Sequence, residues 1–194
     1  MSDIKEVNNL DTTSFEYFQK LETSIAVYLG LSDFRSGGVV IRNERGWREN
    51  EKYIDYAWII LLSRSFVGCG GVFAIKFNET KFREYINKEE LIHGVFTSTD
   101  NGIELIFTES VPTSTFDVNR LFNLNLIDAN KGITIDGVCY DIRIFGSNIN
   151  TFIKVNNPNT VDWKKWENEI WEMGRSLSEK SKNKTLINLF DRIR

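Results

Sequence analysis

Apolar residues recur at helical spacing near both ends of the chain. In the N-terminal segment, Thr13 and Glu16 have the spacing of a capping box, and Gly30 stands where a helix would end. The apolar stripe between them consists of Phe15, Phe18, Leu21, Ile25 and Leu29. The C-terminal stripe consists of Trp163, Trp166, Ile170, Met173 and Leu177. The pattern predicts helices from Thr13 to Gly30 and from about Thr160, followed by a short amphipathic helix over residues 186–193.

Between these helices, alternating apolar and polar residues predict strands. Residues 95–99 and 103–108 flank residues 100–102, where Asp, Asn and Gly suit a tight turn, so we expect a hairpin. Further short strands are predicted at residues 39–41, 72–77 and 151–155.

A second hairpin is predicted around Asp136-Gly137, which separates residues 133–135 from residues 138–144. The alternation along residues 138–144 divides the side chains between two faces. One face carries Val138, Tyr140, Ile142 and Ile144, and the other carries Cys139, Asp141 and Arg143. We expect Asp141 to face solvent.

Residues 53–66 are ambiguous, because residues 56–62 are apolar on all sides and would suit a buried strand or a buried helix. Their aromatic and β-branched content favours a strand. The glycines of residues 68–71 predict a turn, and Asn78 is a suitable cap for a helix over residues 79–92. The charged residues 42–52 predict a loop, and residues 117–126 a further helix.

The order of these elements favours an α+β fold, because helices do not alternate with single strands as a parallel sheet requires. We expect residues 1–194 to form a single domain, with a mainly antiparallel sheet of about five to seven strands built from hairpins. The N-terminal and C-terminal helices should pack on this sheet. Only two prolines and no Gly/Ser-rich stretch argue against a linker between domains.

Composition narrows the function classes. The net charge of −3 gives no cationic field, which disfavours nucleic acid and anionic membranes as partners. Two cysteines, Cys69 and Cys139, form neither a disulfide framework nor a metal-binding spacing. No signal-peptide pattern or apolar run of membrane-spanning length is present, so we expect a cytoplasmic protein. No nucleotide-binding or metal-binding motif indicates a cofactor.

Cys69 is the first candidate for catalysis, because it follows Gly68 and precedes two further glycines whose backbone could stabilise an oxyanion. A cysteine nucleophile needs a base, and His93 is the only histidine in the chain. The alternative interpretation is an inert, partly buried cysteine in a connection between strands.

The carboxylates Glu104, Asp136 and Asp141 are the second candidate set, because a metal-dependent nuclease uses acids close together at a sheet edge. However, no acid-x-lysine pair lies in a predicted strand. The turn explains Asp136 equally well, and a solvent-facing strand position explains Asp141.

Two groups of residues suit a protein interface. Arg45 and Arg48 flank Trp47 in a stretch where interspersed glutamates cancel the positive charge. Trp171 falls outside the apolar stripe of its helix, close to Glu167 and Glu172. A tryptophan among charged residues is typical of a binding hot spot, so Trp171→Ala should weaken partner binding by about 2 kcal/mol or more. The alternative is that Trp171 covers the sheet edge or packs on the last helix.

The leading hypothesis is therefore a non-enzymatic protein-binding module, such as an inhibitor or an immunity-type protein that masks a partner. The competing hypothesis is a small hydrolase or nuclease that uses Cys69 with His93, or Glu104 with Asp136 and Asp141. A third hypothesis is a structural or capsid-associated protein, which would form a homo-oligomer through a large interface.

Overall fold

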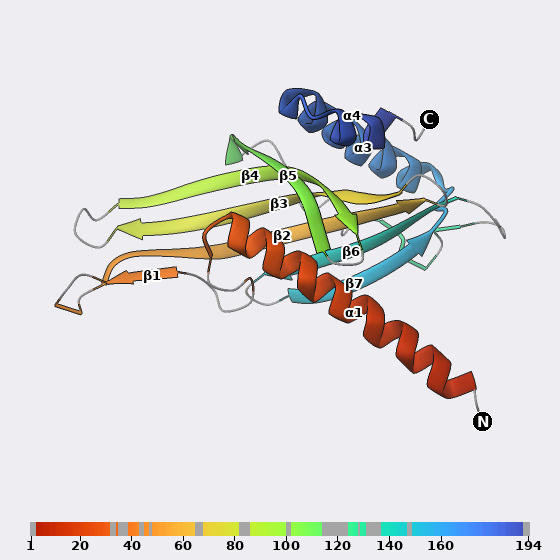
Figure 1. Ribbon diagram of the computed structural model, residues 1–194, viewed down its shortest axis with the longest axis horizontal. Helices are drawn as coiled ribbons and strands as arrows, with labels where there is room; N and C mark the ends of the chain where they lie inside the picture. Colours follow the sequence, from red (N-terminus) through yellow and green to blue (C-terminus); the bar gives the residue numbers. More distant parts are fainter. Residues whose placement is uncertain are drawn as a thin grey trace.

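The computed structural model of the chain contains one seven-stranded antiparallel sheet with helices on both faces (Figure 1). It describes residues 3–31, 34, 39–42, 45–46, 48–64, 68–81, 86–99, 102–113, 124–127, 129–130, 137–146 and 149–191. The predicted α+β fold with an antiparallel sheet is confirmed.

The strands are β1 (Val39–Arg42), β2 (Arg48–Arg64), β3 (Gly68–Lys81), β4 (Ile86–Thr99), β5 (Gly102–Val111), β6 (Val138–Gly146) and β7 (Ile149–Asn156). Six of them follow the order β5-β4-β3-β2-β6-β7. β1 pairs with the first residues of β2, and β6 pairs with β2 from Tyr56 onward. β1 and β6 therefore follow one another along the same side of β2.

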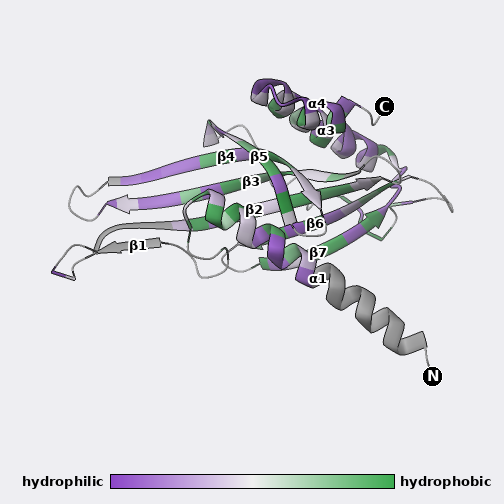
Figure 2. Cartoon of the chain, in the orientation of Figure 1, coloured by the Kyte–Doolittle hydropathy of each residue, from purple (hydrophilic) through white to green (hydrophobic). Residues whose placement is uncertain are grey.

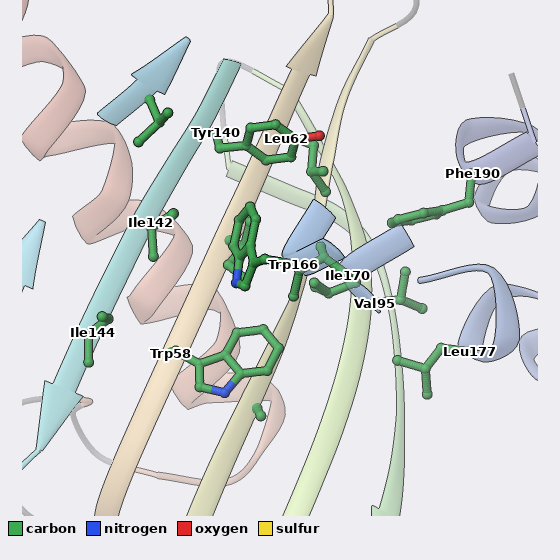
Figure 3. Close-up of a cluster of buried hydrophobic side chains, with 14 of the residues drawn as sticks. Trp58, Leu62, Val95, Tyr140, Ile142, Ile144, Trp166, Ile170, Leu177 and Phe190 are labelled. Carbon is green, nitrogen blue, oxygen red and sulfur yellow. The ribbon is translucent and has the colours of Figure 1, made fainter. Parts of the chain in front are cut away.

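Two apolar cores lie on opposite faces of this sheet. One face is covered by α3 (Val161–Ser181) and α4 (Lys184–Asp191), and we call it the α3 face. Figure 3 shows its core, in which Trp58 and Tyr140 of the sheet lie close to Trp166 of α3. The other face, the α1 face, is covered by α1 (Asp3–Tyr28). Its core contains Phe18, Leu21 and Ile25 of α1 together with Ile59, Leu61, Phe73, Ile75, Phe77 and Phe96 of the sheet.

Residues 56–62 are apolar on all sides because β2 is covered on both faces. Trp58, Ile60 and Leu62 pack on the α3 face, while Ala57, Ile59 and Leu61 pack on the α1 face. The preferred interpretation of residues 53–66 as a strand is confirmed for residues 53–64, and residues 65–66 lie outside the described residues. The first hairpin is also confirmed, since Thr99 pairs with Gly102, and the strand at residues 151–155 is part of β7.

The predicted helix over residues 79–92 is wrong. β3 continues to Lys81, and β4 begins at Ile86 and pairs back with it. Asn78 pairs with Tyr53 on one side and Glu89 on the other, so neighbouring strands satisfy its backbone instead of a helix. The charged stretch over residues 42–52 is likewise not all loop, because β2 begins at Arg48.

The predicted turn over residues 68–71 is also wrong, because β3 begins at Gly68. Close packing explains these glycines. A Cβ atom at Gly70 would meet Leu189 of α4 and the carbonyl of Phe96, and one at Gly71 would meet the carbonyl of Ile60 and the ring of Phe96. Glycine is required at these two positions because neighbouring side chains and carbonyl groups lie close to the β3 backbone. The glycines do not serve to change the direction of the chain.

The terminal helices differ from expectation at one boundary. α1 begins at Asp3, so Thr13 lies inside the helix and does not cap it. Gly30 follows the helix with a φ of 70°, which glycine adopts without strain, as expected for a helix stop. α3 begins at Val161, next to the predicted Thr160, and α4 is the predicted last helix. None of the described helices has the length and apolar character needed to cross a membrane.

Two predictions fall largely outside the described residues. Of the predicted helix at residues 117–126, only residues 124–126 are described, and they are not helical. Residues 133–136 of the second hairpin are not described; β6 pairs with β2 and β7. The predicted alternation along β6 is confirmed, with Tyr140, Ile142 and Ile144 on the α3 face. Asp141 does not face solvent, because it is only 8% exposed.

Candidate functional site

Cys69 and His93 lie on opposite faces of the sheet. Cys69 packs against the core of the α1 face and pairs with Ser98 of β4. His93 pairs with Ala74, which belongs to the core of the α3 face, as do Leu91 and Val95 on either side of His93. Ser98 and His93 are also five positions apart on β4, which corresponds to roughly 16 Å. A general base must come within about 3 Å of the group that it deprotonates, so the geometry does not support a Cys69–His93 pair.

His93 instead lies beside an ion pair that joins the end of α3 to β5. The Nζ atom of Lys180 is 2.7 Å from both carboxylate oxygens of Glu109. Burial lowers the pKa of His93; the Glu109 carboxylate opposes this effect, and the Lys180 ammonium adds to it. The imidazole is therefore held in its neutral form under a helix end.

Cys139 and Cys69 lie on either side of Ser63, because Ser63 pairs with Cys69 of β3 and with Cys139 of β6. The two cysteines are thus two strand spacings apart, or roughly 10 Å between Cα atoms. A disulfide needs less than about 7 Å. Burial raises the pKa of Cys139, and the Asp141 charge raises it further, while Lys154 and a hydrogen bond with Ser63 act in the opposite direction. The Cys139 thiol is therefore a poor nucleophile.

The candidate carboxylates are far apart. Glu104 is exposed on β5, at one end of the strand order, whereas Asp141 is buried on β6, four strands away. Four strand spacings correspond to roughly 19 Å, too far for two ligands of one metal ion. Asp141 lies 3.5 Å from Lys154, and burial raises the pKa of its carboxyl group. Asp136 lies outside the described residues.

Trp171 and Glu167 turn toward the sheet. The indole N–H of Trp171 donates to the hydroxyl of Tyr140 at 3.0 Å, and its ring contacts Phe190 of α4 edge-on. The same Tyr140 hydroxyl donates to Glu167, which also accepts from Lys164 at 2.5 Å. These contacts fix α3 on β6. The contact with Phe190 is the one expected from the alternative interpretation, in which Trp171 packs on the last helix. Its role as a binding hot spot stays a prediction.

The remaining predicted interface residues are Glu172, Arg45, Arg48 and Trp47. Glu172 is exposed on α3. Arg45 is exposed in the turn between β1 and β2, at the far end of the sheet from the C-terminal helices (Figure 1). Arg48 is the first residue of β2, and Trp47 lies outside the described residues. Hydrophilic residues predominate in the parts of β3 and β4 that lie at the same end of the sheet as the β1–β2 turn (Figure 2).

One surface that the sequence analysis missed carries aliphatic side chains exposed to water. Ile127 is 99% exposed, Val161 72% and Leu126 48%. We call these three residues the aliphatic patch. Most aliphatic residues of this size are buried in folded proteins, so three exposed ones at one place require an explanation.

Hydrogen bonds hold the two segments of this patch together. The indole N–H of Trp163 donates to the carbonyl of Asn125 at 3.0 Å, and the backbone N–H of Asn159 donates to the carbonyl of Ala129 at 2.9 Å. The segment that carries Leu126 and Ile127 thus lies alongside the segment that carries Val161. The side chains of Asn130 and Asn159 also bond, and Asn130 bonds to the carbonyl of Asn156.

A local signal for this patch is present in the sequence. Leu126 and Ile127 stand between Asn125 and Asp128, and Asn130 follows soon after. Asn and Asp favour turns, and the side chain of Asn125 accepts from the backbone N–H of Ile127 at 3.1 Å. An aliphatic pair enclosed by turn residues is typical of a loop with apolar side chains, whereas the helix predicted over residues 117–126 would end at Leu126.

Within the described part of the chain, no three His, Cys, Asp or Glu side chains come together in a way that could hold a metal ion. Comparison of the chain with models of protein families, with characterised proteins and with solved structures finds no match.

Proposed function

We propose that the chain is a non-enzymatic, protein-binding module of the inhibitor or immunity type, which acts in the cytoplasm by masking a partner. The observation that carries this proposal is the aliphatic patch, in which Ile127 stands in solvent on a segment fixed by hydrogen bonds. Exposed aliphatic side chains on a preorganised segment lose little conformational entropy on binding, so they suit a protein interface.

The surroundings of the patch indicate the chemistry of the partner. Asp162 and Lys165, whose side chains are 76% and 71% exposed, lie 3.7 Å apart on the first turn of α3. An apolar centre with a mixed-charge rim is the usual organisation of a protein–protein interface. We therefore propose a partner with an apolar pocket that receives Ile127, and a rim that carries both charge signs.

The separation of Cys69 from His93, and of Glu104 from Asp141, gives no support to the competing hydrolase and nuclease hypotheses. A reducing compartment is consistent with two cysteines that form no disulfide with each other. The cytoplasmic location and the identity of the partner remain part of the proposal.

The proposal is tested by capturing a partner from the native host with the full chain and measuring its affinity for variants. We expect Ile127→Asp and Val161→Asp each to weaken binding by about 2 kcal/mol or more, because a carboxylate would be buried in an apolar pocket. Val27→Asp is the matched control, because Val27 is 71% exposed on α1 and Val161 is 72% exposed on α3.

Equal loss of affinity in Val27→Asp and Val161→Asp would contradict a role for the patch. Failure to obtain any stoichiometric partner, together with a catalytic activity of the purified chain, would contradict the proposed function itself.

A further inference from the structure

β7 is an edge strand whose sequence suits continued pairing. It is the last strand in the sheet order and pairs with β6; no other described strand pairs with it. It contains neither proline nor glycine, and Lys154 is its only charged residue. An exposed edge strand of this kind presents backbone N–H and C=O groups to other chains, and proteins usually protect such edges.

The opposite edge of the sheet is protected. β5 carries Glu104 and Glu109, the latter bound to Lys180 of α3, and Gly102 at its start lies against Ser24 of α1. Charges and covering helices are the common means of blocking an edge. β7 carries no acidic residue, and although α1 contacts β7, it covers Phe152 only in part. Phe152 on its α1 face is instead 40% exposed while its ring contacts Phe18 of α1 edge-on.

The sequence of β7 is complementary to itself in an antiparallel register centred on Phe152. In that register Phe152 faces Phe152 of a second copy, Asn150 faces Lys154, Thr151 faces Ile153 and Ile149 faces Val155. Each pair lies on one face, because positions paired in this way have the same parity along the strand. No lysine faces a lysine, and the α3-face pairs are β-branched, which favours strand pairing.

We infer that the chain forms a two-fold symmetric dimer in which β7 pairs antiparallel with β7 of a second copy and the sheet continues from one copy into the other. Such an interface is isologous, so each edge is satisfied by the same edge of its partner. α1 crosses β7 and continues past this edge of the sheet (Figure 1), so the two α1 helices must pass side by side above the joined strands. The dimer uses β7, not the aliphatic patch, so it stands independently of the proposed function.

The first test is the mass of the full chain in solution, measured by sedimentation equilibrium. The wild type should have twice the chain mass of 22.5 kDa. Phe152→Lys and Phe152→Glu should each raise the dimer dissociation constant at least about tenfold, because like charges would face each other at the two-fold axis. An equimolar mixture of the two variants should restore the dimer, which also shows that both are folded. A monomeric wild type, or a folded mixture that does not dimerise, overturns the inference.

The second test fixes the register. Directly opposed residues have Cβ atoms about 4.5–5.5 Å apart, close to the range of a disulfide. Under mild oxidation Phe152→Cys should form a cross-linked dimer, whereas Asn150→Cys, which faces Lys154, should not. The wild type controls for reaction through Cys69 and Cys139. Equal cross-linking of both variants, or none in Phe152→Cys, overturns the proposed pairing.

Discussion

Glu22 of α1 and Arg143 of β6 form a buried ion pair between helix and sheet. The Nε atom of Arg143 lies 2.7 Å from Oε1 of Glu22, and each side chain is only 5% exposed. Nη1 of Arg143 also donates to the carbonyls of Ile144 and Thr151, both at 3.2 Å. Each charge thus has a partner where α1 packs on the sheet, and the pair fixes the position of the helix on the sheet.

Removal of one member of this pair should be strongly destabilising. We expect Glu22→Ala to lower the free energy of unfolding by about 3–5 kcal/mol, because the Arg143 guanidinium would remain buried without its counter-charge. The double variant Glu22→Leu with Arg143→Met should recover much of this loss, since an apolar pair needs no compensation. Urea denaturation of the two variants and the wild type measures both effects. A single variant as stable as the wild type would contradict a buried pair.

Trp171 should contribute to stability through α3 and α4. Trp171→Ala removes the contact with Phe190 and the hydrogen bond to Tyr140, so we expect the free energy of unfolding to fall by about 2–3 kcal/mol. Trp171→Phe keeps most of the ring contact and should cost about 1 kcal/mol. Thermal and urea unfolding give these values. If Trp171 is also a hot spot, Trp171→Phe should weaken partner binding by more than this loss of stability accounts for.

The fold was predictable where the local pattern and the tertiary environment agree. The spacing of Trp163, Trp166 and Ile170 identifies α3, and the turn before Gly102 identifies the β4–β5 hairpin. The helix predicted from Asn78 failed because residues 79–81 of β3 pair with residues 50–52 of β2 and with residues 86–88 of β4, and this pairing outweighs the local helical propensity.

The candidate site was less predictable, for the same reason. The sequence cannot show that Cys69 and His93 point to opposite faces, because that depends on the register between β3 and β4. Nor can it show that Trp171 turns inward, since Tyr140 is 31 positions away. The exposure of Ile127 depends on bonds from Trp163 and Asn159, both distant along the chain.

Substitution of Cys69 should leave function intact. Cys69→Ser exchanges a half-buried thiol for a hydroxyl of similar size, and we expect partner affinity to stay within about 0.5 kcal/mol of the wild type. The same variant leaves Cys139 as the only thiol, whose raised pKa should slow its reaction with a thiol reagent relative to the unfolded chain. Reaction rates near neutral pH, in the presence and absence of denaturant, measure this difference. Loss of function in Cys69→Ser would restore the catalytic hypothesis for this residue.

Acid should destabilise the chain through His93. Its pKa is lowered in the folded state, so the unfolded chain, with a histidine pKa near about 6.5, takes up the proton first as pH falls. Above the unfolded pKa, His93 should therefore have no effect on the free energy of unfolding. As pH falls from the unfolded pKa toward the lower folded pKa, the free energy of unfolding should decrease. Below the folded pKa, no further loss arises from His93. The raised pKa of Asp141 has the opposite sign, since its contribution to stability decreases as pH rises above the unfolded value. Comparing urea denaturation of the wild type and His93→Gln across this range isolates the histidine. A pH dependence that is the same in both proteins would show that His93 is not the group responsible.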